Sequence, residues 1–125
     1  MKYVQLVLFT LLCISITHGN PKDDVTRFRT GKFVYADDEK TIVIRTETTQ
    51  TEIFNDGKSK LILSVKWLDD YTYELTHKKS VNAKGCLDKG DWIRARITSW
   101  EGDRYTCEYT SNKCGSGKST FIKQE

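Results

Sequence analysis

The side chains of this 125-residue chain that could perform acid–base chemistry are one strand-end histidine and the carboxylates of two predicted turns. His77 ends a predicted strand, and no serine or cysteine nucleophile motif accompanies it. Asp69 and Asp70 could act with it as general acid and base, but aspartate in a tight turn usually bonds its own backbone. The second acidic turn contains Asp37, Asp38 and Glu39. We therefore expect no enzyme, with a small secreted hydrolase using His77 and turn carboxylates as the alternative.

The cysteines predict one disulfide and no metal site. If neighbouring strands alternate in direction, the loops that contain Cys86 and Cys114 lie at the same end of the sheet, which predicts a Cys86–Cys114 disulfide. A bond between Cys107 and Cys114 is the competing pair. Cys107 alternates with Glu108, so we expect it to be a buried small hydrophobe. There is no Cys-x-x-Cys spacing, and we expect neither a metal ion nor another cofactor.

Aromatic residues are numerous and fall mostly on predicted inward positions of the strands. Buried tyrosines need a partner for the hydroxyl group. These residues therefore either fill the core or line a cavity, because the interior of an eight-stranded barrel can do either. Five of them are the candidate ligand-binding residues: Tyr35, Trp67, Tyr73, Tyr105 and Tyr109.

One predicted strand carries an aromatic and basic stripe on its outward positions, formed by Trp92, Arg94, Arg96 and Trp100. Such a stripe could stack single-stranded nucleic acid or a glycan. Lysine and arginine on an exposed strand also protect a sheet from edge pairing, and we favour that interpretation. The formal net charge is only +3, so we expect no nucleic-acid partner.

These residues depend on strands that are recognisable from alternating apolar and polar side chains. Leu61, Leu63, Val65 and Trp67 share one face of such a segment, a period of two that is typical of a half-buried strand. Eight segments are predicted as strands: 28–35, 41–46, 49–54, 61–67, 71–77, 93–98, 105–109 and 119–123.

Short turns join most of these segments, so the strands should be antiparallel and follow one another as a meander. The expected fold is all-β, a lipocalin-like barrel of eight antiparallel strands. A small five-stranded OB-like barrel or a sandwich is the alternative.

The first residues predict export. An apolar run from Tyr3 to Ile16 is too short to cross a bilayer and precedes Thr17-His18-Gly19, as in a signal peptide that occupies residues 1–19. Cys13 follows Leu12 rather than a small residue, so soluble export is favoured over a lipid anchor. We expect residues 20–27 to form a flexible tail and residues 28–125 to form a single barrel domain in the periplasm or outside the cell, with no membrane-spanning segment.

Short motifs between Phe28 and about Tyr109 resemble those of a loose group of short, exported, uncharacterised bacterial proteins. The motifs are Phe28-Arg29-Thr30-Gly31-Lys32-Phe33, Ile44-Arg45, Gln50-Thr51-Glu52, Val65-Lys66-Trp67 and Tyr73-Glu74-Leu75. Some members of this group are called "DNA topoisomerase IV", but the chain has no ATP site that would support such an activity. The resemblance implies no activity for any residue.

The expected function is therefore binding. We expect an exported binding module that holds a small amphipathic ligand, or a partner protein of the cell envelope, at the open end of its barrel. Surface binding of nucleic acid or glycan by the aromatic and basic stripe is a further alternative.

Overall fold

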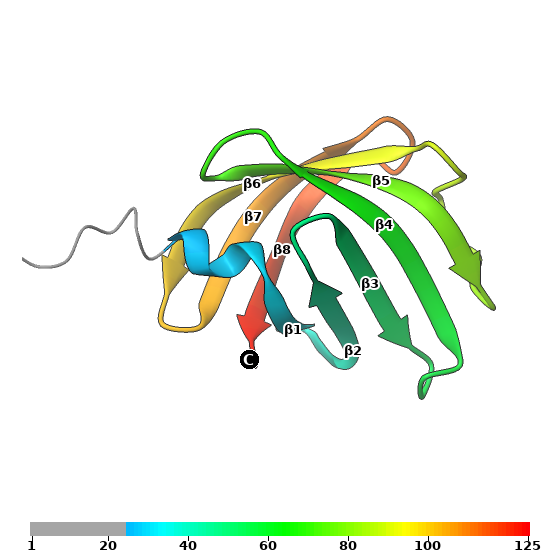
Figure 1. Ribbon diagram of the computed structural model, residues 1–125, viewed down its shortest axis with the longest axis horizontal. Coiled ribbons are helices and arrows are strands. Elements are labelled where there is room, and N and C mark those ends of the chain that lie inside the picture. The colour runs from blue at the N-terminus through cyan, green and yellow to red at the C-terminus, as the bar shows by residue number, and fades with distance from the viewer. Residues whose placement is uncertain (1–24) are drawn as a thin grey trace, which may run out of the picture.

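The computed structural model describes residues 25–125 of the chain, most of which form eight antiparallel strands (Figure 1). A short 3-10 helix, η1, precedes the strands. The bounds are η1 Thr26–Arg29, β1 Gly31–Tyr35, β2 Asp38–Arg45, β3 Thr49–Phe54, β4 Ser59–Trp67, β5 Thr72–Val81, β6 Trp92–Glu101, β7 Arg104–Ser111 and β8 Ser116–Lys123. Each of the eight strands overlaps a segment that the alternating pattern predicts.

The strands close into a barrel. Each strand pairs with the next along the chain, and β1 closes the ring by pairing with β8, with Val34 opposite Ile122. Closure leaves no strand with unpaired backbone groups along an edge. The predicted eight-stranded antiparallel meander is confirmed, and the five-stranded and sandwich alternatives are excluded.

Side chains alternate between the interior and the outer surface, as the period of two requires. Leu63 and Val65 on β4, for example, are at most 8% exposed, whereas Lys66 between Val65 and Trp67 is exposed. A register shift between Ile97 and Ser99 interrupts this pattern on β6. It places Trp100 opposite the buried Tyr105, so the prediction that Trp100 faces outward with the arginines of β6 is wrong.

Helix η1 covers one end of the barrel, which we call the closed end. Val25 and Phe28 are both completely buried, because residues three apart lie on the same face of a 3-10 turn. The predicted first strand is therefore too long: it begins at Gly31, not at Phe28. The predicted tail over 20–27 also differs from the structure, since Val25 belongs to the core, while residues 20–24 lie outside the described residues.

Gly31 allows the sharp change from helix η1 to strand β1. Its φ is +135°, and a Cβ atom there would lie only 2.4 Å from the backbone oxygen of Glu125. The backbone around it closes the barrel on the C-terminal segment, because Lys32 N donates a hydrogen bond to Glu125 O over 2.9 Å. Glycine thus lets the two ends of the barrel domain meet.

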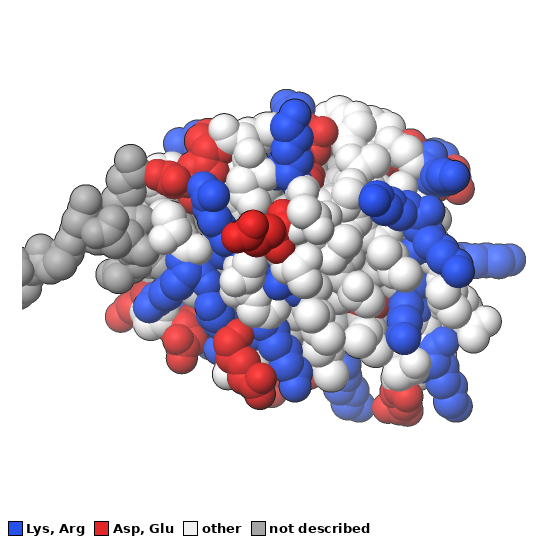
Figure 2. Space-filling view, viewed as in Figure 1, with Lys and Arg blue, Asp and Glu red and all other residues white. Residues whose placement is uncertain are grey.

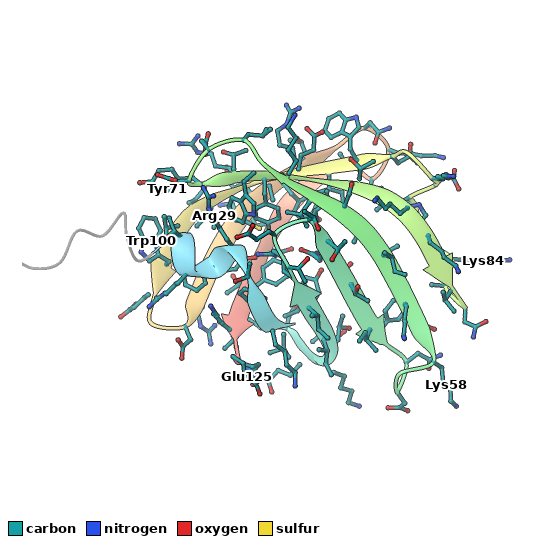
Figure 3. All side chains as sticks on the ribbon, in the orientation of Figure 1. Arg29, Lys58, Tyr71, Lys84, Trp100 and Glu125 are labelled. Atoms are coloured by element: carbon teal, nitrogen blue, oxygen red, sulfur yellow. A yellow bond between two sulfur atoms is a disulfide. The ribbon has the colours of Figure 1, made fainter. Side chains whose placement is uncertain are left out.

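A disulfide joins two loops at the opposite end, which we call the open end. Cys86 in the β5–β6 loop is bonded to Cys114 in the β7–β8 loop, with their Cα atoms 5.5 Å apart. This confirms the predicted pair. Cys107 on β7 is free and buried, also as predicted. Figure 3 labels Lys58 and Lys84 near the open end, and Tyr71 and Trp100 beside η1.

The predicted signal peptide over 1–19, including Cys13, lies outside the described residues. Within residues 25–125, no helix has the length and apolar character needed to span a membrane.

Replacing both Cys86 and Cys114 by alanine should lower the free energy of unfolding by about 3 kcal/mol, because a crosslink across 28 residues restricts the unfolded chain. Urea unfolding measures this loss. Wild-type protein unfolded under reducing conditions should match the double variant. An unchanged urea midpoint would contradict a stabilising role for the crosslink.

Candidate functional site

A cavity of about 380 Å³ lies inside the barrel and extends to the disulfide at the open end. Its volume is within the range of small-molecule sites, roughly 300–1,000 Å³. Most of the wall is apolar or aromatic, with a few polar groups. The lining residues are Tyr35, Gln50, Glu52, Leu63, Tyr73, Leu75, Cys86, Ile93, Ala95, Cys107, Tyr109, Cys114, Ser119 and Phe121.

The buried guanidinium of Arg45 lies between this cavity and the closed end. Arg45 is 2% exposed and occupies an inward position at the end of β2. Its Nε donates a hydrogen bond to Gln50 Oε1 over 2.8 Å, and Nη1 donates to the carbonyl oxygen of Phe28 over 2.9 Å. Nη2 donates to the hydroxyl oxygens of Tyr105, over 2.8 Å, and Tyr73, over 3.3 Å. One side chain therefore joins β2, β3, β5, β7 and helix η1.

Aromatic rings surround the Arg45 charge in place of a carboxylate. Its guanidinium carbon lies 4.5 Å from the ring centre of Tyr73 and 4.8 Å from that of Phe33. The rings of Tyr105 and Phe121 lie 5.8 and 5.9 Å away. No acidic side chain of the described residues forms an ion pair with Arg45. The charge is stabilised by π faces and neutral oxygen acceptors.

The tyrosines that contact Arg45 remain protonated. Burial raises the pKa of Tyr73 well above its ordinary value and also raises the pKa of Tyr105. Their hydroxyl oxygens are 3.1 Å apart, so one donates to the other while both accept from Arg45. Because Tyr73 also lines the cavity, this network forms the cavity's floor.

Glu52 brings a carboxyl group into the cavity wall. It follows Gln50 by two residues on β3, and both occupy inward positions opposite Leu61 and Leu63 of β4. The Tyr35 hydroxyl donates a hydrogen bond to Glu52 Oε1. Burial raises the pKa of Glu52, although the hydrogen bond from Tyr35 and the charge of Arg45 oppose the rise.

Tyr109 forms part of the wall near the mouth and owes its position to a glycine. Gly117 on β8 lies directly opposite Tyr109 on β7. A Cβ atom on Gly117 would lie 2.6 Å from the Tyr109 hydroxyl oxygen, so the ring packs over a backbone that has no side chain. Cys107 lines the same cavity, but burial raises its pKa, so its thiol is not activated as a nucleophile.

The structure divides the five candidate ligand-binding residues into two groups. Tyr35, Tyr73 and Tyr109 line the cavity together. Tyr105 is completely buried against Phe28 and Phe121, on the Arg45 side of the floor. Trp67, at the end of β4, lies against Tyr73 under the guanidinium of Arg29 and does not line the cavity.

Sequence reasoning missed Arg45, Gln50 and Glu52. The signal that identifies them is a polar or charged side chain on the inward phase of a strand. Val43 and Arg45 share that phase on β2, and Gln50 and Glu52 share it on β3. The alternation of apolar and polar residues is weak in β2 and β3. Which of their residues face inward follows only from the pairing of β2 with β1 and of β3 with β4.

The residues of the hydrolase hypothesis do not meet. Asp69 accepts hydrogen bonds from the backbone N–H groups of Tyr71 and Thr72, both over 2.8 Å, as a turn aspartate does. Asp70 pairs with Arg29 at 3.1 Å. His77 lies five residues beyond Thr72 along β5, a distance of about 16 Å in a strand. Its Nε2 is 2.7 Å from Ser80 Oγ.

The aromatic and basic stripe on the outer face is partly neutralised. Arg94 pairs with Glu74 at 2.9 Å and lies over the ring of Trp92 at 5.3 Å. Trp100 belongs to the other face of β6 and packs against Tyr71, with ring centres 5.9 Å apart. The four predicted residues therefore do not form one continuous surface.

Comparison with known proteins adds no relative. No family model, curated protein or solved structure matches the chain.

Arg45→Met should lower the free energy of unfolding by about 3 kcal/mol, because it leaves the Phe28 carbonyl and the Gln50 side chain without their donor. Amide hydrogen exchange should also show that η1 loses protection. Arg94→Met is the matched control, since its ion pair is exposed and worth about 1 kcal/mol or less. Equal effects of the two substitutions would contradict a central role for Arg45.

Glu52→Gln should stabilise the protein progressively as the pH rises. Because the pKa of Glu52 is raised on folding, the folded state holds this proton more tightly than the unfolded state does, and stability falls as pH rises above about 4.5. Glutamine can still accept the Tyr35 hydrogen bond but cannot ionise. Urea unfolding of both proteins from pH 4 to pH 8 should show a widening difference. A constant difference would contradict the raised pKa.

Proposed function

We propose that this protein binds one small amphipathic ligand inside its barrel, in the manner of a lipocalin-like carrier. The observation that carries the proposal is the cavity itself, a recess open at one end, with a mainly apolar wall and a small set of polar groups. This combination is typical of small-molecule sites, where apolar contacts supply affinity and a few polar groups fix the orientation.

The two ends of the barrel favour this function because they differ. At the closed end, η1 and the Arg45 network fill the interior. At the open end, the cavity reaches the Cys86–Cys114 disulfide, which holds two loops together at the mouth. A ligand would therefore enter between these loops and stop at the tyrosine hydroxyl groups of the floor.

An exported location agrees with the chemistry of the molecule. A structural disulfide persists in oxidising compartments such as the periplasm or the cell exterior. We propose that residues 1–19 direct export and that the barrel works there.

The alternative functions receive less support. A hydrolase would need carboxylates near His77, whereas Asp69 is engaged with backbone groups and Asp70 with Arg29. A nucleic-acid surface would need gathered positive charge. In Figure 2, acidic side chains lie among the basic ones on the left, whereas mainly basic side chains lie on the right, on either side of an uncharged area. The predicted stripe itself is interrupted by the ion pair between Arg94 and Glu74.

The function is tested with N-phenyl-1-naphthylamine, a neutral dye that fluoresces in apolar surroundings. Wild-type protein should enhance its fluorescence with saturation at one dye per chain. Ala95→Phe should weaken binding about tenfold or more, because Ala95 is buried on the cavity wall and a phenyl ring there occupies the ligand's space.

The matched control is Thr110→Phe, which places the same ring on an exposed position of the neighbouring strand β7. It should leave dye binding unchanged, and circular dichroism should show both variants folded. Absence of saturable binding to the wild type, or equal binding to the wild type and a folded Ala95→Phe variant, would contradict the proposal.

A further inference from the structure

Glu52 is the one charged side chain on the wall of the cavity. All the other lining residues are apolar, aromatic, hydroxyl, amide or sulfur-containing. The electrostatic character of this space at neutral pH therefore depends on a single carboxyl group.

The hydrogen bonding of that carboxyl group is incomplete. Tyr35 donates to Oε1, and within residues 25–125 no hydrogen bond or ion pair engages Oε2. Glu52 is half-buried, so its carboxylate is accessible from the cavity, and a carboxylate with reduced hydration is stabilised by a charged partner or by further donors. Glu52 thus retains acceptor capacity for a donor that enters the cavity.

Arg45 does not fill this role. Its donor groups are directed toward Gln50, Phe28 and the two tyrosines of the floor, and it does not line the cavity. Gln50 lies on the same inward face as Glu52 and engages the Arg45 Nε through its own side-chain oxygen. The donor groups of Arg45 are therefore occupied by partners at the closed end of the barrel.

Aromatic side chains share the cavity wall with Glu52. The lining includes Tyr35, Tyr73, Tyr109 and Phe121, and the rings of Tyr35 and Phe121 are in contact with their centres 4.5 Å apart. The face of an aromatic ring attracts a cation, and the attraction grows when water is excluded. A carboxylate beside aromatic rings suits a protonated amine, whereas an anionic group would be repelled by Glu52.

We infer that the ligand is a small organic amine, an inference that rests on the proposed ligand-binding function. Its ammonium group pairs with Glu52, and its apolar body lies against Leu63, Leu75 and Ile93. The ammonium group supplies the donors that Oε2 lacks. The aliphatic side chains on β4, β5 and β6 supply the apolar part of the wall.

Three probes of nearly equal size and different charge test this inference: 2-phenylethylamine, 2-phenylethanol and 3-phenylpropanoate. Each is titrated at pH 7 against protein saturated with N-phenyl-1-naphthylamine, and displacement of the dye is measured. The amine should displace it at a concentration about tenfold lower than the alcohol, and the carboxylate should be weakest.

Glu52→Gln should remove the preference for the amine while leaving the affinity for the alcohol unchanged, because glutamine keeps the Tyr35 hydrogen bond without the charge. Glu108→Gln is the matched control, since Glu108 is an exposed acid on β7. It should retain the wild-type order of the three probes.

The outcomes separate the two proposals. Equal displacement by the three probes, or a stronger effect of the alcohol or the carboxylate, overturns the amine inference while the dye still demonstrates a ligand site. An equal loss of affinity for all three probes in Glu52→Gln also overturns it, because Glu52 would then only shape the cavity. Failure of the dye to bind at all overturns the proposed function itself.

Discussion

One buried positive charge organises this barrel. The guanidinium of Arg45 lies between β2, β3, β5 and β7 and reaches the backbone of η1, and among residues 25–125 no carboxylate forms an ion pair with it. Removal of an unpaired charge from water is costly unless hydrogen bonds and polarisable groups replace its hydration. Four hydrogen bonds and four aromatic rings do so here. The geometry of the closed end follows from that requirement.

The asymmetry of the barrel follows from the position of this charge. Side chains fill the half of the barrel that surrounds Arg45, and the buried side chains of Val25 and Phe28 cover its closed end. The other half retains open volume, and the Cys86–Cys114 crosslink joins two loops at its mouth. The same eight strands therefore provide a packed core at one end and a recess at the other. Such a division allows a small barrel to be stable and to bind a ligand at the same time.

Much of the scaffold could be predicted from the sequence, because local alternation and turn lengths determine it. The strand over Leu61–Trp67, the meander order and the Cys86–Cys114 pair follow from the period of two and the polarity of an antiparallel sheet. Features that depend on register or on the barrel ends could not be predicted in this way. The bulge beyond Ile97 moves Trp100 to the other face of β6. The segment before Gly31 forms the 3-10 helix η1 instead of a strand, and Val25 and Phe28 are buried at the closed end of the barrel. Arg45 and Glu52 were hidden for a related reason: a charged residue on a strand is ordinarily assigned to the surface.

The central proposal is that a small molecule enters the barrel and contacts its inward side chains next to the floor formed by the Arg45 network. Methyl-labelled NMR spectra recorded during titration with 2-phenylethylamine test this claim residue by residue. The methyl signals of Leu63, Leu75 and Ile93, which face the cavity, should shift with saturation, while those of Ile44 and Ile62 on the outer face should remain in place. Shifts confined to the outer isoleucines, or none at all, would contradict it.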